Sequence, residues 1–380
     1  MLLCAIQRVK CCLQLKLYDM KKLLVLFIPT ILFVACKKDE PINIQQGSPV
    51  IENTLISGVN CNSFYRLIAD SGMEDIYSAK QTLDGGFILC GSTSTAAESE
   101  SDILVIKTNC FGKTEWIKTI SNEFADYGYD IILISTGEFL LVANYSLNPS
   151  GAPIISYQGQ LIKITDSGEV IWKKHYDFGY TSRFNKLIEI ADGGFIICGT
   201  DNSNGGFVFK TDASGTKIWR NELENNIRLL DITIASTLNY TVCGSVTVNQ
   251  QNDIFVAELN IMGDTVWTKS IDKKNITNEA TSIVTLGNDI IISGYNRTSG
   301  IDLPGFAMKL NAIGNEIWYK SLEINGIEEL SNIILTHDNE ILGAGSKSNL
   351  LSLVKMSSNN GTIIWETNSV LNNLKIEIVG

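Results

Sequence analysis

Few residues in this chain have the type and spacing that catalysis requires. The two histidines, His175 and His337, stand far apart and lack metal-ligand spacing, so both are expected at the surface. The chain has no Gly-x-Ser-x-Gly nucleophile turn, phosphate-binding loop or Cys-x-x-Cys pair. Carboxylates are more numerous, and Asp126, Asp130 and Asp177 fall near one rim of the repeats described below. Two of them could serve as the acid and base of a glycosidase, but acids are also common in loops, so we assign no catalytic residue and no metal ligand.

Six regularly spaced tryptophans mark an internal repeat, whose strands and turns would have to position any such residues. They lie at intervals of 56, 47, 48, 51 and 47 residues, each four residues after a glycine and nine or ten after a charged residue. The tryptophans are Trp116, Trp172, Trp219, Trp267, Trp318 and Trp365; the glycines are Gly112, Gly168, Gly215, Gly263, Gly314 and Gly361; the charged residues are Lys107, Lys163, Lys210, Glu258, Lys309 and Lys355. This period and the strand-like patterning predict an all-β fold, a β-propeller of four-stranded blades.

Each repeat is expected to contain four short strands, named a to d in chain order. In the third copy an apolar run at 195–199 is followed by a polar loop, a second run at 207–212 and a turn at 213–215 that leads into Trp219. Glycine, aspartate and asparagine in the a–b turns suit tight hairpins that need positive φ. The glycine of each c–d turn stands where a left-handed residue would close a hairpin with a bulge.

The strand pattern extends beyond the first and last tryptophans, and the two ends decide how the ring closes. Residues 64–68 occupy the place of a tryptophan strand, and residues 374–379 resemble the a strand at 187–190. The simplest closure is a seventh blade assembled from both termini, which would hide two open sheet edges. Rings of six or eight blades are the alternatives. The propeller is therefore predicted over residues 49–380.

The repeated pattern Asp/Asn-x-x-Gly-x-x-x-Trp resembles the tryptophan motif of quinoprotein-like (PQQ-like) propeller repeats over residues 73–369. The resemblance implies that each tryptophan docks one blade against the next. Thr165 and an extra residue before Trp365 depart from the motif. Quinoprotein dehydrogenases carry a vicinal cysteine pair inside the ring, whereas the adjacent cysteines of this chain, Cys11 and Cys12, lie near its start. The resemblance therefore implies an architecture, and no cofactor is expected.

The N-terminal region resembles a bacterial lipoprotein signal. Two lysines after Met20 are followed by an apolar stretch at 23–35 and by Phe-Val-Ala-Cys at 33–36, which matches a lipobox ending in Cys36. The apolar stretch is too short to span a bilayer. We interpret residues 1–19 as an untranslated extension, 20–35 as a cleaved signal peptide, and 36–48 as the lipidated Cys36 and a flexible tether. Several acyl chains on Cys36 would hold the protein stably on a membrane.

The sequence also predicts a location and a charge. Residues 37–40, Lys-Lys-Asp-Glu, are similar to the export tag of Bacteroidota lipoproteins, which implies an outer-membrane anchor on the cell surface or, without export, facing the periplasm. The formal net charge of −11 becomes −15 when residues 1–35, with five positive charges and one negative, are removed. A negative field of this size argues against nucleic acid and against anionic lipid as ligands, so membrane contact is expected through the lipid anchor only.

Most of the nine cysteines fit structural positions. Cys90, Cys198 and Cys243 share one b-strand column with Ala143, Ser293 and Ala344, a column that requires a small buried residue. Equivalent positions in different blades are too far apart for a disulfide, whose Cα atoms lie within about 7 Å of each other. Cys61 and Cys110 both lie near tryptophan-strand hairpins at adjacent positions in the ring, and a bridge between them is one possibility.

Geometry predicts which face would bind a ligand. The a–b and c–d turns lie on one face and are uniformly short, whereas the b–c loops and d–a crossovers lie on the other and vary in length. The longest loop, at 146–156, contains Asn148. The crossovers carry the aromatic residues Phe124, Tyr127, Tyr129, Tyr176, Phe178, Tyr180 and Phe184. About half of these aromatics are expected to fill gaps between blades. The residues predicted to form the binding surface are Phe124, Tyr127, Tyr129, Tyr176 and Tyr180, with Asn148.

Three functions fit the sequence. The preferred one is a monomeric, membrane-anchored lipoprotein that binds an envelope protein or a glycan through the long-loop face without catalysis. The second is an assembly scaffold in the envelope, like the quinoprotein-like lipoprotein of the outer-membrane barrel machinery, which the chain resembles in anchor and propeller type. The third is an enzyme, a glycosidase or a quinoprotein-like protein, with a site in the central channel. The fold alone does not choose among them.

Overall fold

The computed structural model describes residues 31–34, 65–68, 73–94, 101–122, 124–147, 156–178, 181–202, 205–224, 226–273, 276–298, 301–323, 326–347 and 350–372. Within these ranges the regular elements are β-strands, and there is no α-helix. No helix in the described part of the chain is long and apolar enough to cross a membrane.

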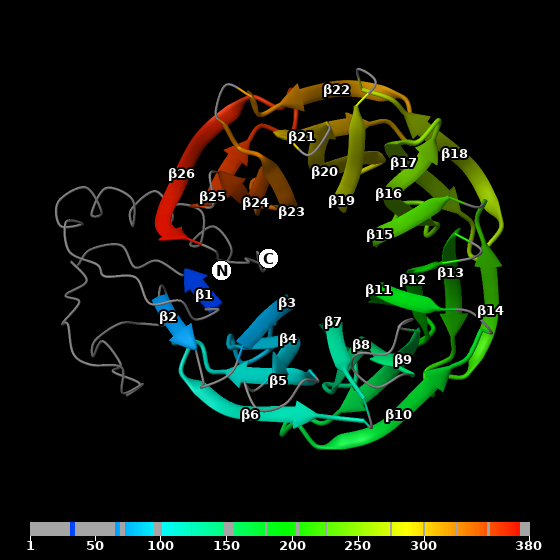
Figure 1. Ribbon diagram of the computed structural model, residues 1–380, viewed down its shortest axis with the longest axis vertical. Coiled ribbons are helices and arrows are strands. Elements are labelled where there is room, and N and C mark those ends of the chain that lie inside the picture. The colour runs from blue at the N-terminus through cyan, green and yellow to red at the C-terminus, as the bar shows by residue number, and fades with distance from the viewer. Residues whose placement is uncertain are drawn as a thin grey trace.

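The strands form four-stranded antiparallel blades arranged in a ring (Figure 1). Blade 1 contains β3 (Met73–Gln81), β4 (Phe87–Ser94), β5 (Asp102–Thr108) and β6 (Thr114–Ile120). Blade 2 contains β7 (Asp126–Leu133), β8 (Phe139–Ser146), β9 (Tyr157–Ile164) and β10 (Val170–Tyr176). Blade 3 contains β11 (Ser182–Glu189), β12 (Phe195–Asp201), β13 (Gly205–Thr211) and β14 (Lys217–Glu222). The prediction of an all-β propeller with four-stranded blades is confirmed.

The second half of the ring repeats this order. Blade 4 contains β15 (Ile227–Ile234), β16 (Tyr240–Val248), β17 (Gln251–Leu259) and β18 (Thr265–Ile271). Blade 5 contains β19 (Thr277–Leu286), β20 (Asp289–Thr298), β21 (Ile301–Leu310) and β22 (Glu316–Ser321). Blade 6 contains β23 (Glu329–Leu335), β24 (Ile341–Lys347), β25 (Leu350–Met356) and β26 (Ile363–Asn372). A single bridge between Tyr295 and Glu329 joins blades 5 and 6 into one eight-stranded sheet.

A two-stranded sheet lies between the last and first described blades, where a seventh blade built from both termini was predicted. β1 (Ile31–Val34) pairs antiparallel with β2 (Tyr65–Ile68), and this two-stranded sheet lies between β26 and blade 1 (Figure 1). β2 falls where a tryptophan strand was expected, but its partner lies within the predicted signal peptide, residues 20–35. The predicted C-terminal strand at 374–379 lies outside the described residues, so the closure of a seventh blade by both termini stays a prediction.

The tryptophans contact the blade that follows their own. In blades 2 to 6, a Cβ atom added to the c–d turn glycine would lie 2.8 to 3.0 Å from an indole carbon of the preceding blade. Those glycines also have φ between 69° and 89°, so they are required both for backbone conformation and for space. The Trp116 indole donates a hydrogen bond to the Asp166 carbonyl of blade 2 at 2.9 Å. Each half-buried indole contributes about 1.5–3 kcal/mol through its apolar surface.

The apolar core is divided into clusters between neighbouring blades. One cluster joins Ile88 and Val105 of blade 1 to Ile131 and Phe139 of blade 2, with Trp116 packed on its edge. The other four junctions between consecutive blades have the same arrangement, each with the tryptophan of the earlier blade. Because each of these five clusters is shared, consecutive blades bury their facing apolar surfaces against each other.

A second set of contacts links the innermost strands. Every a strand has a register shift. In blades 1, 2, 4 and 5 the residue after the shift accepts a hydrogen bond from a backbone amide of the next blade. The Ser78 hydroxyl accepts from the Ile131 amide at 3.4 Å and donates to Asp130 at 2.6 Å. The Asp130 carboxylate accepts from the Leu187 amide at 3.2 Å. Burial raises the pKa of Asp130, but the nearby Lys186 charge and these hydrogen bonds outweigh it and leave the pKa lowered.

On the turn face, a column of lysines pairs with acids of the a–b turns. The residue opposite each tryptophan is a lysine in five of the six blades. The ion pairs are Lys107–Asp84 at 2.8 Å, Lys163–Glu138 at 3.3 Å, Lys210–Asp192 at 2.6 Å, Lys309–Asp289 at 2.9 Å and Lys355–Asp338 at 2.7 Å. In blade 4 this position is occupied by Glu258, opposite Trp267.

The cysteines occupy the expected kind of position, with one correction. Cys90, Cys198 and Cys243 are buried, and none of the three forms a disulfide. In blade 2 the strand register aligns Val142 with this column, because Asp130 pairs with Val142, whereas the sequence alignment had assigned Ala143. Cys110, in the β5–β6 turn, is disulfide-bonded. Cys61, the partner considered from the sequence, lies outside the described residues.

Candidate functional site

The crossover face, which carries the b–c loops and the d–a crossovers, presents one residue per blade at the entrance to the a strands. These residues share a register position just before the a-strand bulge, and we call them the axial ring: Asp75, Tyr127, Arg183, Arg228, Glu279 and Glu329. The a strands are the innermost strands of the ring (Figure 1). The axial ring therefore gathers charged and aromatic side chains from all six described blades around the axis.

Within the axial ring, Arg228 and Glu279 form an ion pair between blades 4 and 5. The Arg228 guanidinium lies 3.1 Å from the Glu279 carboxylate, which also accepts from Ser245 at 2.9 Å and from the Tyr295 hydroxyl at 3.1 Å. Burial, followed by the Glu279 charge, raises the pKa of Tyr295 to about 12. The Glu279 side chain is 4% exposed and that of Arg228 is 56% exposed. The guanidinium is thus held by a buried acid while part of its donor set faces solvent.

Aromatic contacts extend this surface over blades 1 to 3. The Tyr127 ring meets the Tyr157 ring edge-on with centroids 6.2 Å apart, and the Arg183 guanidinium lies 4.7 Å above Tyr157. Tyr77 and Tyr129 stack across the first blade junction at 5.2 Å. Tyrosine and arginine with rigid, partly exposed groups are the residues most enriched in protein-binding surfaces. The crossover face has this composition.

A polar cavity of about 260 Å³ adjoins Arg228. It lies between blades 3 and 4 and is lined by Thr200, Asp201, Asn202, Gly205, Asn226, Ile227, Arg228, Ser245, Thr247 and Asn252. Asp201 is 2% exposed and pairs with Arg220, whose guanidinium lies 4.1 Å from the Phe178 ring centroid. The second oxygen of Asp201, Oδ1, has no hydrogen-bond partner among the described residues. The cavity thus has a polar lining beside the exposed donors of Arg228.

The three acids considered for catalysis do not form one site. Asp126 accepts from the backbone and side chain of Asn122, both at 2.7 Å, and from Gln160 at 3.1 Å. Burial raises the pKa of Asp126 to about 6 against these hydrogen bonds. Asp177 accepts from Gln158 at 2.9 Å, and its charge and that of Asp126 both act on Tyr145. Asp126 and Asp177 therefore lie in one polar cluster of blade 2, whereas Asp130 belongs to the contacts between a strands.

The predicted aromatic binding residues have several different placements. Tyr127 and Tyr129 lie in strand β7 rather than in a crossover, because the strand begins at Asp126, and both are half-buried. Phe124 is half-buried in the crossover before β7. Tyr176 was predicted to bind ligand, but the structure buries it: its ring lies 5.1 Å from that of Phe209 and its hydroxyl donates to the Gly215 carbonyl. Asn148, Tyr180 and Cys36 lie outside the described residues.

Sequence reasoning missed Arg183, Arg228, Glu279 and Asp201. Aligning the a strands at the residue before the bulge would have revealed charged side chains at one ring position, but the bulge itself is not visible in the sequence. His175 is exposed and meets Tyr145 edge-on at 4.5 Å, away from any metal-like arrangement. Among the described residues, no group of three or more His, Cys, Asp or Glu side chains could hold a metal ion.

Comparisons with known proteins support the architecture. No protein-family model and no curated protein sequence matches the chain. Among solved structures, streptogramin B lyase is 16% identical with a TM-score of 0.53, over 80% of this chain and 86% of the other. The Dos1 propeller is 13% identical with a TM-score of 0.48, over 79% and 71%. A protein from Bacteroides caccae is 15% identical with a TM-score of 0.47, over 70% and 90%. At 16% identity the likeness to streptogramin B lyase supports the fold alone.

Proposed function

We propose that the chain is a non-catalytic binding scaffold that recognises an envelope protein or a glycan through its crossover face. The observation that carries the proposal is the half-exposed Arg228, fixed by buried Glu279 beside a cavity lined mainly by polar residues. Such a site offers the Arg228 donors in a fixed position beside amide and hydroxyl side chains, which suits hydroxyl or amide groups of a ligand.

The aromatic part of the face supports the same proposal. Tyr157 is contacted by Tyr127 at its edge and by Arg183 over its ring, so a ligand would meet a preorganised surface with little side-chain entropy to lose. In contrast, the lysines opposite the tryptophans on the turn face pair with their own a–b turn acids. This difference favours the crossover face as the binding side.

The proposal includes a membrane anchor at Cys36 and an outer-membrane location, on the cell surface or facing the periplasm. Its support is the apolar stretch at 23–35, the lipobox and the Lys-Lys-Asp-Glu sequence after Cys36. An assembly role in the envelope uses the same anchor and face, and accessibility to a protease added to intact cells would separate the two. The protein acts as a monomer in this proposal.

A second candidate is a glycosidase-like enzyme, favoured by one observation. Buried Asp126 has a pKa of about 6, the range of a general acid at neutral pH, and lies in one polar cluster with Asp177. One of the structural neighbours is a lyase by name, streptogramin B lyase. If this candidate holds, Asp126→Asn abolishes hydrolysis of an envelope polysaccharide.

The test of the binding proposal is a capture experiment. A soluble chain that starts at residue 36 with Cys36→Ser is used as bait against envelope extract and a panel of polysaccharides. Arg228→Gln should weaken a specific ligand about tenfold, because a hydrogen bond to a charged group contributes roughly 1.5–3 kcal/mol. Tyr127→Ala should weaken it with little change in melting temperature.

Lys113→Gln is the matched control, since it removes one positive charge from an exposed turn on the opposite face. Equal losses for Lys113→Gln and Arg228→Gln would show that only net charge matters and would contradict the proposed site. Loss of folding in Tyr127→Ala would place that ring in the core and remove it from the surface.

A further inference from the structure

Blade 4 departs from the repeat at three positions that meet between blades 4 and 5 on the turn face. Glu258 stands where the other blades have a lysine. Thr241, opposite Glu258, stands where the other blades have isoleucine or leucine: Ile88, Leu140, Ile196, Ile291 and Leu342. Thr237 aligns with the a–b turn acids Asp84, Asp192 and Asp338. The internal ion pair of this column is thus replaced by one buried acid with hydroxyl neighbours.

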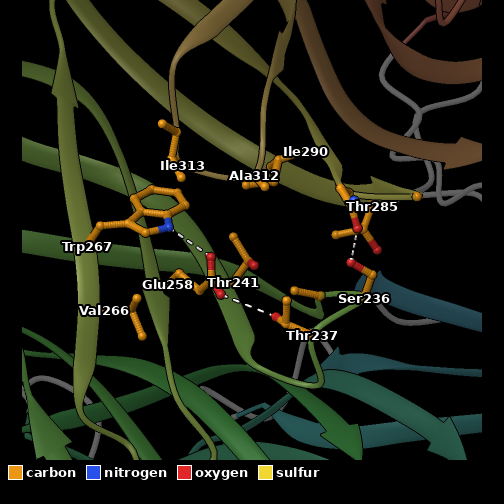
Figure 2. A pocket seen from close by; sticks show the side chains of 13 residues that line it. Ser236, Thr237, Thr241, Glu258, Val266, Trp267, Thr285, Ile290, Ala312 and Ile313 are labelled. Carbon is orange, nitrogen blue, oxygen red and sulfur yellow. Dashed lines mark hydrogen bonds between the residues drawn. The ribbon is translucent and has the colours of Figure 1, made fainter.

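Hydrogen bonds hold the Glu258 carboxylate in place without neutralising it. Its Oε1 accepts from the Asn239 amide at 2.5 Å and from Thr237 at 3.3 Å. Its Oε2 accepts from the Trp267 indole at 2.8 Å (Figure 2). In blades 1 and 5 the indole donates instead to a carbonyl of the following blade. No cation among the described residues forms an ion pair with Glu258, which is 7% exposed.

A cavity of about 250 Å³ opens beside this carboxylate (Figure 2). Its polar lining includes Glu258, Thr237 and Thr241, and its apolar lining includes Trp267, Val266 and Ile313. The Thr241 hydroxyl is fully buried and has no hydrogen-bond partner within the described part of the chain. A buried hydroxyl without a partner costs roughly 1–3 kcal/mol, so a group that bonds to it gains affinity.

We propose that this cavity, the Glu258 pocket, binds a primary alkylammonium group. An ammonium head would pair with Glu258 and donate a hydrogen bond to Thr241. The ligand would thus supply the positive charge that a lysine supplies in the other blades, and Glu258 the negative charge. The alkyl chain would pack on Trp267 and on Val266 and Ile313, which are 53% and 60% exposed. An anion is disfavoured by the carboxylate, and a neutral alcohol leaves Glu258 without a countercharge.

The pocket lies on the face opposite the crossover surface, so its test is independent of the proposed function. Calorimetric titration of the folded chain with n-butylammonium should show binding at least tenfold tighter than with 1-butanol. Glu258→Gln, which keeps the shape and removes the charge, should weaken n-butylammonium about tenfold or more. Thr241→Val should weaken it several-fold without lowering the melting temperature.

The matched control restores the repeat. Thr237→Asp with Glu258→Lys rebuilds the internal ion pair of the other blades and should abolish binding while the protein stays folded. Tighter binding of Nα-acetyl-lysine methylamide than of n-butylammonium would identify a lysine side chain of a partner as the source of the ammonium, and the reverse order would identify a free amine. Absence of binding, equal binding of 1-butanol, or unchanged binding by Glu258→Gln or by the double variant would overturn the proposal.

Discussion

Replacement of Gly215 by alanine should separate two costs that meet at the c–d turn. Gly215 has φ of +80°, and an added Cβ would lie 2.9 Å from the Trp172 ring. The left-handed backbone costs an L residue about 1–2 kcal/mol. Overpacking against the indole adds about 1–3 kcal/mol. The expected loss in the free energy of unfolding is therefore about 2–5 kcal/mol.

Gly137→Ala provides the matched control. Gly137 has φ of +93°, but an added Cβ would meet no atom within 4 Å. Its substitution should therefore cost only the backbone term, about 1–2 kcal/mol. The measurement is urea unfolding followed by tryptophan fluorescence and, independently, by circular dichroism at 25 °C, with both variants prepared in the same background.

A double-mutant cycle tests the contact itself. Trp172→Ala alone should cost about 3–5 kcal/mol. In the Trp172→Ala background the contact with the indole disappears, and the remaining close atom, Cδ of Lys174 at 3.1 Å, belongs to a flexible side chain. Gly215→Ala should then cost about as much as Gly137→Ala does. A Gly215→Ala cost equal to that of Gly137→Ala in the parent chain, or zero coupling in the cycle, would refute the argument that glycine is required to seat the indole.

Three further predictions concern a turn, a buried acid and the N-terminal strand. Leu238 has φ of +67° and is 67% exposed, so Leu238→Gly should raise the free energy of unfolding by about 1 kcal/mol, whereas Leu83→Gly, at an exposed leucine without positive φ, should give no gain. Burial raises the pKa of Asp126 from 3.8 to about 6, so the resulting stabilisation is complete below about pH 4 and is lost as the pH rises through 6. Urea unfolding at pH 4 and pH 7 should show a smaller difference for Asp126→Asn than for the parent. A chain starting at residue 36 lacks β1 but keeps every described junction between blades, so it should melt within a few degrees of the longer chain; a cooperative loss of structure would make β1 part of the ring.

The repeat positions were predictable because their requirements are local. A glycine such as Gly263 is required by its own turn, and Trp267 follows it four residues later in the same hairpin. The alternation of apolar residues then sets the strand faces. This is why the fold class and the blade motif could be read from one sequence.

The candidate site was less predictable because it depends on contacts between blades. Arg228 and Glu279 are 51 positions apart, and they meet only because each a strand has a bulge that fixes the register of the residue before it. The burial of Tyr176 was not predicted for a related reason: its position at the end of a d strand directs the ring into the core of the blade 2–3 junction. The pairing of β1 with β2 was not predicted either, because the two strands are about 30 residues apart and their local sequences do not specify each other as partners.

The contact of each tryptophan with the glycine of the next blade also gives the ring an order of assembly during synthesis. Trp116 and Gly168, for example, are separated by roughly one repeat, so the indole leaves the ribosome seconds before its seat does at about 5–20 residues per second. Every nascent blade therefore carries an exposed indole until its successor emerges. A translational pause within a repeat would prolong the exposure of the preceding indole. A pause just after a c–d turn would come when the indole can already contact the glycine of that turn.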